Sequence, residues 1–144
     1  MELWELIARE QVRDTYARYN HAGDALRLET LAGCFCDDGQ LEVRGREPAV
    51  GREAIVRFLR DGTTADRAPT GERRLVRHSV ANIWFESVKP DEIRSSAYFT
   101  IVTDQGLDAV GRYRDELVPD GHTWHFRRRF VSVDWTAASG LRTP

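Results

Sequence analysis

Apolar side chains near the start of the chain recur at steps of three and four residues. Within residues 2–20, charged side chains separate an apolar stripe formed by Trp4, Ala8, Val12, Tyr16 and Tyr19. This spacing is typical of an α-helix that buries one face. The segment is therefore predicted to be an amphipathic helix whose buried stripe ends in two phenol hydroxyl groups that need hydrogen-bond partners.

The helical pattern breaks near Gly23, and a second amphipathic stretch continues to Ala32. Asp24 is thereby placed at a corner between two helices. One interpretation is structural, because aspartate often caps the N-terminus of a helix. The other is functional, because Tyr19, Asp24 and the later His78 are the kinds of group that transfer protons.

From Arg74 onward the apolar period changes to two, which predicts β-strands. Long strands are expected at residues 75–86, 92–103, 107–118 and 123–135, with turn sequences rich in Pro, Asp and Gly between them. Earlier segments are predicted to be a turn at residues 37–39, a strand at 40–44, a loop at 45–51 and a helix at 52–59. Helices followed by an antiparallel meander predict an α+β fold, with the helices on one face of a curved sheet.

The 144 residues suit a single domain. We expect this domain to span residues 1–137 and residues 138–144 to form a flexible C-terminal tail. The polar segment at residues 63–73 is predicted to be a flexible loop at the rim of a pocket.

Polar residues on a predicted inner sheet face are candidates for a site, because buried polar groups need partners. In the strand at residues 107–118 the charged face is outside, so Tyr113 and Asp115 point inward. In the strand at residues 75–86, His78, Asn82 and Trp84 share a face. The structural interpretation of His78 is that a histidine in a strand most often has no role in a site.

The last strand carries three consecutive arginines, and regular alternation places Arg128 on the apolar face with Phe126. A β-bulge would instead turn Arg129 inward, so the choice between the two stays open. The structural interpretation is that one of the arginines is buried and pairs with a carboxylate such as Asp115.

The net charge and the composition limit the classes of binding partner that we expect. A formal net charge of −2 and a pI near 6.1 give no reason to expect nucleic acid or an anionic membrane as a partner. The sequence has no long apolar run, and its charged N-terminus is unlike a signal peptide. Cys34 and Cys36 are expected to be reduced thiols, and the protein is expected in the cytoplasm.

No metal or cofactor is expected. A metal site built from His21, Asp24 and His78 lacks a recognisable ligand spacing. His122 and His125 lie on opposite faces of a predicted strand, which argues against a shared metal.

Five segments, which cover nearly the whole chain, carry a family resemblance: YARYNHAGDALRLETLAGCFCDDGQLEV, GREAIVRFL, RHSVANIWFE, GRYRDEL and DGHTWHFRRRFVSVDW. Together they resemble the SnoaL-like branch of the nuclear transport factor 2-like superfamily. The resemblance implies a cone-shaped α+β barrel, in which a strongly curved, mainly antiparallel sheet wraps around a long N-terminal helix. It also implies a deep pocket at the open end of the cone.

Dehydratases of this superfamily share an Asp at the end of the first helical region and a His early in a pocket strand, which correspond to Asp24 and His78. The Tyr that precedes the Asp by five residues in bile acid 7α-dehydratase matches Tyr19. A further polar residue of similar enzymes falls on Asp104. The sequence departs from scytalone dehydratase in the strand at residues 107–118, and this departure leaves the substrate class open.

The leading hypothesis is a cofactor-independent lyase of the dehydratase type. Its substrate is expected to be a hydrophobic hydroxy compound with a carbonyl group, such as a steroid, a polyketide or an aromatic. His78, oriented by Asp24, would be the base, and Tyr19 would donate to the developing oxyanion. The expected substrate-contacting residues are Tyr16, Asn82, Tyr113, Asp115, Asp104 and Arg129.

Two alternatives remain. One is an isomerase or cyclase that uses the same dyad, and the other is a non-catalytic small-molecule-binding or assembly domain. In either case we expect a homodimer or a homotrimer, for which Trp84, Phe85 and Trp135 supply an aromatic contact surface.

Overall fold

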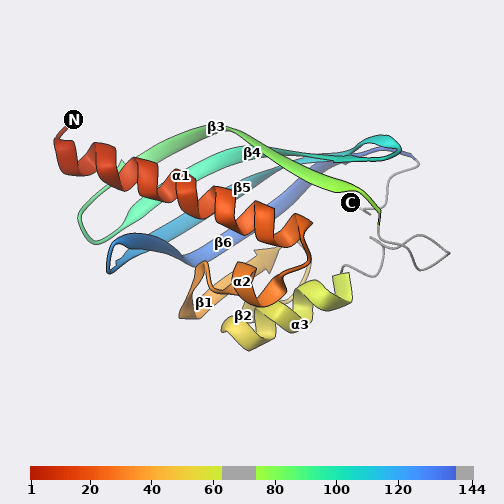
Figure 1. The fold of residues 1–144 in the computed structure, drawn as a ribbon, viewed down its shortest axis with the longest axis horizontal. Coiled ribbons are helices and arrows are strands. Elements are labelled where there is room, and N and C mark those ends of the chain that lie inside the picture. The colour runs from red at the N-terminus through yellow and green to blue at the C-terminus, as the bar shows by residue number, and fades with distance from the viewer. Residues whose placement is uncertain (63–73, 139–144) are drawn as a thin grey trace.

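The computed structural model of the chain describes residues 1–62 and 74–138. Its elements, drawn in Figure 1, are α1 (Leu3–Asp24), α2 (Leu28–Ala32), β1 (Phe35–Val43), β2 (Ala49–Val50), α3 (Arg52–Gly62), β3 (Val76–Val88), β4 (Ile93–Thr103), β5 (Gly106–Asp120) and β6 (Thr123–Thr136). The predicted loop at residues 63–73 lies outside the described residues, and so does the predicted tail from residue 139 onward.

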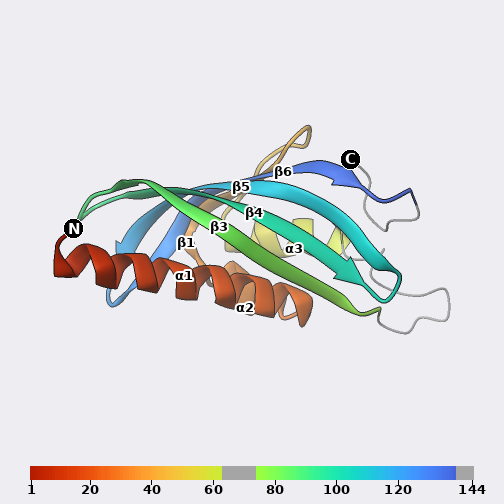
Figure 2. The ribbon, with the colours of Figure 1, turned by 90° about the horizontal axis from the view of Figure 1, so that it is seen from above.

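The strands form one six-stranded sheet in the order β2-β1-β6-β5-β4-β3. β1 and β6 run parallel, and every other neighbouring pair is antiparallel. Figure 2 shows the helices gathered on the concave side of this curved sheet. The predicted α+β fold is confirmed, as an open sheet rather than a closed barrel, because β2 and β3 form opposite edges.

α1 begins with a capping box, in which the Glu2 and Glu5 side chains each accept a hydrogen bond from the other residue's backbone N–H. The predicted buried stripe is confirmed apart from Trp4, which is 40% exposed. The helix continues through Gly23, beyond its predicted end. A Cβ at Gly23 would lie 3.1 Å from Leu31 Cδ1, so the glycine lets α2 pack closely against the end of α1.

β1 is longer than predicted, because the segment Asp37–Gly39, expected to be a turn, lies inside the strand. The register of β1 against β6 shifts between Phe35 and Gln40, so the strand accommodates the segment as a local irregularity. A Cβ on Gly39 would lie 2.9 Å from the Phe126 carbonyl oxygen, which explains the glycine there. β2 then pairs with β1 where a loop was predicted.

β3 contains a β-bulge at Asn82, whose φ is 53°, and its register against β4 shifts between Ala81 and Trp84. One extra residue in a strand moves all later side chains to the opposite face. Trp84 is consequently 68% exposed, whereas Phe85 is buried. The prediction that Trp84 shares the face of His78 is therefore wrong.

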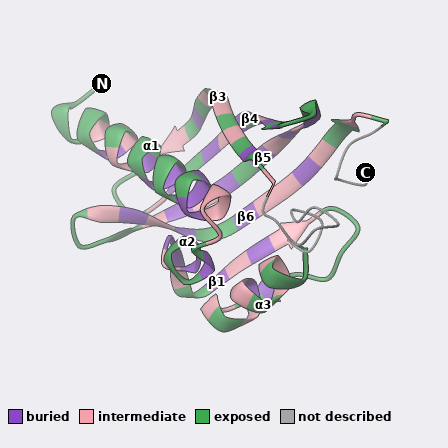
Figure 3. Ribbon diagram, turned by 45° about the vertical axis from the view of Figure 1, so that its right-hand side comes forward, coloured by how far each residue is buried: buried purple, intermediate pink, exposed green. Residues whose placement is uncertain are grey.

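The hydrophobic core lies between α1 and the inner face of the sheet. Figure 3 shows buried positions alternating with exposed ones along the strands, as expected for a sheet with one face covered by helices. α3 adds Ile55, which is fully buried, to the same core. Within the described ranges, no helix has the length and apolar character needed to cross a lipid bilayer.

Candidate functional site

Asp24 and His78 come together where the end of α1 meets the start of β3. The distance from His78 Nδ1 to Asp24 Oδ1 is 2.6 Å. The His78 side chain is 21% exposed and the Asp24 side chain 10% exposed, so the imidazole retains access to solvent while the carboxylate is largely covered. No hydrogen bond to His78 Nε2 is found within residues 1–62 and 74–138, which leaves this nitrogen available to a ligand.

Asp24 also holds the backbone of the strand that carries the imidazole. Its Oδ2 accepts a hydrogen bond from the His78 backbone N–H at 2.9 Å. Because β3 is an edge strand, this N–H lacks a strand partner, and the carboxylate satisfies it. The interpretation of Asp24 as a cap of the second helix is wrong, since the N-cap residue of α2 is Arg27.

Aromatic rings line the inner face of the sheet beside this pair. The His78 and Phe99 ring centroids are 6.4 Å apart, and Phe99 stacks on Tyr113 with centroids 4.7 Å apart. Phe99 lies directly over Gly111, where a Cβ would approach its ring to 2.4 Å. The aromatic layer therefore extends from the strand of His78 to β5.

Arg129 and Asp115 form a fully buried ion pair on the inner face of β5 and β6. Arg129 Nε and Nη2 each donate to an Asp115 oxygen at 2.8 Å, and both side chains are 0% exposed. The register of β5 against β6 shifts between Glu116 and Leu117, and this irregularity turns Arg129 inward and leaves Arg128 exposed. The predicted pairing of a buried arginine with Asp115 is confirmed.

Four aromatic rings surround the Arg129 guanidinium, whose Cζ lies 3.9 to 4.5 Å from the ring centroids of Tyr16, Tyr19, Tyr113 and Phe126. Burial alone lowers the pKa of Arg129, but the Asp115 carboxylate outweighs burial and raises that pKa above its usual value. Arg129 therefore stays charged, and its attraction to the ring faces adds to the ion pair.

The Tyr16 hydroxyl connects α1 to the buried ion pair. It donates a hydrogen bond to Asp115 Oδ2 and lies 3.2 Å from Ser95 Oγ. Burial, and then the charge of Asp115, raises the pKa of Tyr16 well above its ordinary value. Tyr16 is therefore a neutral phenol that fixes the helix to the sheet.

Two further phenols lie near the end of α1. The Tyr113 hydroxyl donates to Asn20 Oδ1 at 3.3 Å. Burial raises the pKa of both Tyr19 and Tyr113, and the charge of Asp24 contributes to the increase at Tyr113. Both hydroxyls therefore stay protonated at neutral pH, and the Tyr113 hydroxyl uses its proton in the bond to Asn20.

Two of the predicted substrate-contacting residues lie outside this interior. Asn82 is exposed at the bulge of β3. Asp104 is exposed in the turn between β4 and β5, where Gln105 Nε2 donates to its Oδ2 at 3.2 Å. The structure instead gathers four of the predicted residues in the buried cluster, namely Tyr16, Tyr113, Asp115 and Arg129.

Asn20, Ser95 and Phe99 complete the cluster, and the sequence analysis missed all three as site residues. The signal for Ser95 is the alternation of β4, in which a polar residue stands between the buried Ile93 and Ala97. Asn20 gave no comparable signal, because its role depends on how α1 is placed against β5.

Titratable side chains elsewhere among the described residues do not form a metal centre. Within the part of the chain that the structure describes, no group of three or more His, Cys, Asp or Glu side chains could hold a metal ion. Cys34 and Cys36 are free thiols, and burial raises the pKa of both. His125 Nδ1 lies 2.9 Å from Asp120 Oδ2, and burial lowers the pKa of His125.

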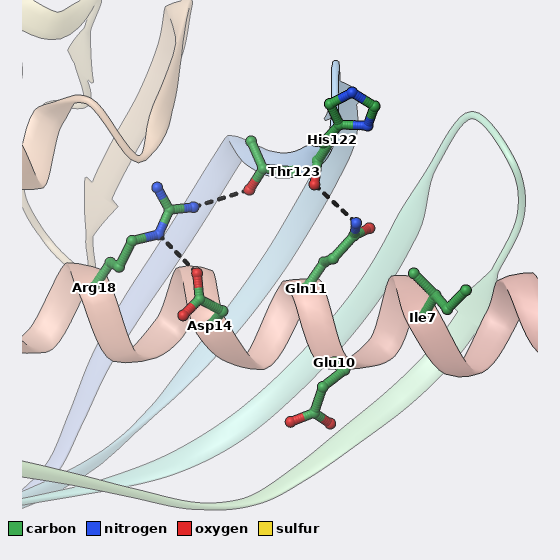
Figure 4. A pocket seen from close by; sticks show the side chains of 7 residues that line it. All are labelled: Ile7, Glu10, Gln11, Asp14, Arg18, His122 and Thr123. Carbon is green, nitrogen blue, oxygen red and sulfur yellow. Dashed lines mark hydrogen bonds and ion pairs between the residues drawn. The ribbon is translucent and has the colours of Figure 1, made fainter.

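A separate open groove of about 490 Å³ lies between α1 and the β5–β6 turn. It is lined by Ile7, Glu10, Gln11, Asp14, Arg18, His122 and Thr123, shown in Figure 4. Arg18 pairs with Asp14 at 3.1 Å and donates to Thr123 Oγ1 at 2.9 Å. These polar contacts fasten the helix to the turn, and the groove contains none of the predicted site residues.

A model of the SnoaL-like domain matches residues 4–130, which run from α1 into β6. The chain belongs to the SnoaL-like domain family. The resemblance inferred from the sequence is thus confirmed over nearly the whole SnoaL-like chain. No curated protein matches it.

Solved structures share the fold of this SnoaL-like domain. A protein from Catenulispora acidiphila, in complex with S-DNPA, is 28% identical with a TM-score of 0.74, and the match covers 88% of this chain and 92% of that one. A scytalone dehydratase-like protein from Novosphingobium aromaticivorans is 21% identical with a TM-score of 0.79 and coverages of 96% and 91%. LinA is 18% identical with a TM-score of 0.77 and coverages of 96% and 95%.

Proposed function

We propose that this SnoaL-like domain is a cofactor-independent lyase that removes water from a hydrophobic hydroxy compound with a carbonyl group. The observation that carries the proposal is the pairing of His78 Nδ1 with Asp24 at 2.6 Å, in a partly exposed imidazole whose Nε2 has no hydrogen-bond partner among the described residues. An imidazole titrates near neutral pH and suits general acid–base chemistry.

In the proposed reaction, His78 Nε2 removes the proton on the carbon next to the carbonyl group. The C–H electron pair forms an enolate, and Asp24 stabilises the imidazolium that results. Collapse of the enolate forms the C=C bond and expels the hydroxyl group, which takes the proton from His78 and leaves as water. The proton removed in the first step thus leaves in the second.

The enolate oxygen needs hydrogen-bond donors, and two neutral phenols support this role. Tyr19 is the donor expected from the sequence. Tyr113 is a second candidate, because its ring stacks on Phe99 beside the His78 ring, and its hydroxyl would exchange its bond to Asn20 for one to the substrate. Donors placed where negative charge develops commonly contribute about 10²–10³-fold to kcat. Arg129 adds fixed positive charge behind both rings.

The substrate class rests on the family and on the aromatic layer beside His78. The dehydratase name of one structural neighbour and the S-DNPA bound to another support a small-molecule substrate in this fold. A steroid, a polyketide or an aromatic compound fits the apolar surroundings of His78 and Phe99. An isomerase or cyclase would use the same first proton transfer. The proposed location of the protein is the cytoplasm.

A second candidate function is a non-catalytic small-molecule-binding or assembly domain. The observation that favours it is the bond from the His78 backbone N–H to Asp24 Oδ2, which gives Asp24 a structural task at the sheet edge. In this case the pair only anchors β3 to α1.

The test begins with a thermal-shift screen of ketones with a β-hydroxyl group from the three compound classes. Compounds that raise the melting temperature are then assayed by mass spectrometry for loss of one water. Asp24→Asn and His78→Gln are expected to lower turnover by about 10²-fold or more and to keep the melting temperature within a few degrees.

The chain offers a matched control in its other histidine–aspartate pair, His125 and Asp120. His125→Gln and Asp120→Asn should retain turnover. Folded Asp24→Asn and His78→Gln variants with unchanged turnover would contradict the lyase proposal. Unfolding of both variants would instead favour the anchoring role.

A further inference from the structure

Asn20 is a buried amide that lies one helical turn before Asp24 in α1. Residues four apart lie on the same face of a helix, so Asn20 and Asp24 face the same part of the sheet. The Tyr113 hydroxyl bonds to Asn20. His78 bonds to Asp24, so one helix face contacts both a phenol and the imidazole of the candidate site.

The hydrogen bonds of Asn20 fix the direction of the Tyr113 proton. Asn20 Nδ2 donates to the Tyr16 backbone carbonyl at 3.0 Å. A carbonyl only accepts, so the amide nitrogen must face Tyr16 and the amide oxygen must face Tyr113. That oxygen also only accepts, which makes the Tyr113 hydroxyl the donor of the bond at 3.3 Å. The phenol proton is therefore directed at the helix face that carries Asp24.

The Tyr113 ring is held firmly, but its hydroxyl is held loosely. Arg129 Cζ lies 3.9 Å from the centroid of this ring, and Phe99 stacks on it with centroids 4.7 Å apart. The bond to Asn20, in contrast, is longer than the roughly 2.5–3.0 Å that is usual for O–H···O bonds. A hydrogen bond to a charged oxygen is stronger than a neutral one. An enolate oxygen would therefore compete successfully with the Asn20 amide for this donor.

We propose that Asn20 is a positioning residue, which keeps the Tyr113 hydroxyl directed toward the Asp24 side of the site until the enolate oxygen replaces the amide as the acceptor. The inference rests on the proposed lyase function. A donor that is already oriented needs no reorganisation when negative charge develops. A neutral acceptor suits this task, because a carboxylate at the same place would retain the phenol proton and repel the enolate.

Asn20→Asp separates a positioning role from a packing role, because the substituted carboxyl group has two protonation states. When it is protonated, its O–H donates to the Tyr16 carbonyl and its C=O accepts from Tyr113, as the amide does. When it is ionised, it cannot donate to that carbonyl, and its charge opposes the enolate. The protonated form has the shape of the amide, so this variant remains a test even if Asn20→Ala does not fold.

The charges around this position favour the protonated form. Arg129 and Asp115 form an ion pair, so their effects largely cancel. Asp24 is balanced only when its partner His78 is protonated. Burial and the Asp24 charge therefore both raise the pKa of a carboxyl group placed at position 20. The neutral form should persist to a higher pH than it would in an exposed aspartate.

The measurement is the turnover of a β-hydroxy ketone by Asn20→Asp, divided at each pH by the turnover of the natural chain. Below the pKa of the new carboxyl group the two chains should be similar. Above that pKa the ratio should fall by up to about tenfold per pH unit, as the protonated fraction falls. Asn20→Ala should lower kcat by about tenfold or more at every pH, with little change in KM.

Thr15→Val is the matched control, because Thr15 is also a buried polar residue of α1 whose side chain bonds to the carbonyl four residues before it. This variant should retain kcat, with a pH-independent ratio to the natural chain. A pH-independent ratio for Asn20→Asp would overturn the inference. A folded Asn20→Ala chain with the same kcat as Thr15→Val would overturn it as well.

The affinity for 4-nitrophenolate tests the inference without turnover. This probe carries a negatively charged oxygen on a planar ring and so resembles an enolate. Asn20→Ala, and Asn20→Asp at high pH, should raise its dissociation constant by about tenfold, whereas Thr15→Val should not. Equal affinities in all of these chains, or no binding by any, would overturn the role of Asn20. The expected affinities without turnover by the natural chain would contradict the lyase proposal alone.

Discussion

At the scale of single residues, the Arg129–Asp115 pair shows how a charge is kept in the core. The guanidinium has two bonds to one carboxylate and four aromatic rings around it. Removing one partner of such a pair leaves the other charge buried and unpaired. The adjacent Arg128 makes its ion pair with Glu42 at the surface, where solvent screens it.

We therefore expect Arg129→Met to lower the free energy of unfolding by about 3–5 kcal/mol and Arg128→Met by about 1 kcal/mol or less. Urea denaturation measures both. The double variant Arg129→Met/Asp115→Leu should recover much of the loss, because no unpaired charge remains. Equal losses for the two single arginine variants would contradict the buried-charge explanation.

The buried phenols predict how stability depends on alkaline pH. The folded pKa of Tyr113 is raised above the value of about 10 expected in the unfolded chain. Its contribution to stability is therefore complete below pH 10, and it is lost as the pH rises toward the folded pKa, because only the unfolded phenol ionises there.

Tyr113→Phe should accordingly reduce the loss of unfolding free energy above pH 10 by about 1.4 kcal/mol per pH unit. Denaturant titrations across this pH range provide the measurement, with the exposed Tyr98→Phe as a control. An unchanged slope in Tyr113→Phe, or an equal change in Tyr98→Phe, would argue against a buried neutral phenol.

Sequence reasoning identified the individual groups but not all of their orientations. The inward positions of Tyr113 and Asp115 followed from simple alternation, because the opposite face of β5 is charged. Which of Arg128 and Arg129 points inward depended on a register shift near Glu116, and no pattern in the sequence predicts that shift.

At the scale of elements, β3 to β6 begin and end within two residues of the predicted strands. Their turn sequences and period-two patterns are local, so a sequence suffices to find them. The end of α1 was harder, because Gly23 is a helix breaker by propensity and its packing against α2 decides the outcome. The same holds for residues 37–39, which lie inside β1 where its register against β6 shifts.

The bulge of β3 gives a prediction at this scale. Asn82 has a φ of 53°, a conformation that asparagine tolerates and β-branched residues do not. Asn82→Val should lower the free energy of unfolding by about 1–2 kcal/mol, whereas Asn82→Gly should change it by less than about 0.5 kcal/mol. Urea denaturation distinguishes them, and a valine variant as stable as the glycine variant would show that the bulge relaxes.

At the scale of the whole molecule, the order of helices and strands was enough to predict the fold class, and five segments were enough to predict the family. The pairing of Asp24 with His78 joins residues that are 54 positions apart, so it followed from the resemblance rather than from any local pattern. The exposure of Trp84 on the outer face depends on the Asn82 bulge, which regular alternation does not reveal.

The proposed lyase chemistry requires His78 Nε2 to remove a proton next to a carbonyl group while Asp24 orients the ring. Proton NMR in D2O tests this claim directly, because any ketone that binds should exchange its α-hydrogen for deuterium, whichever reaction follows. The expected result is rapid exchange with the natural chain and with His125→Gln, and loss of exchange with folded His78→Gln. Exchange that continues undiminished in folded His78→Gln would contradict the claim.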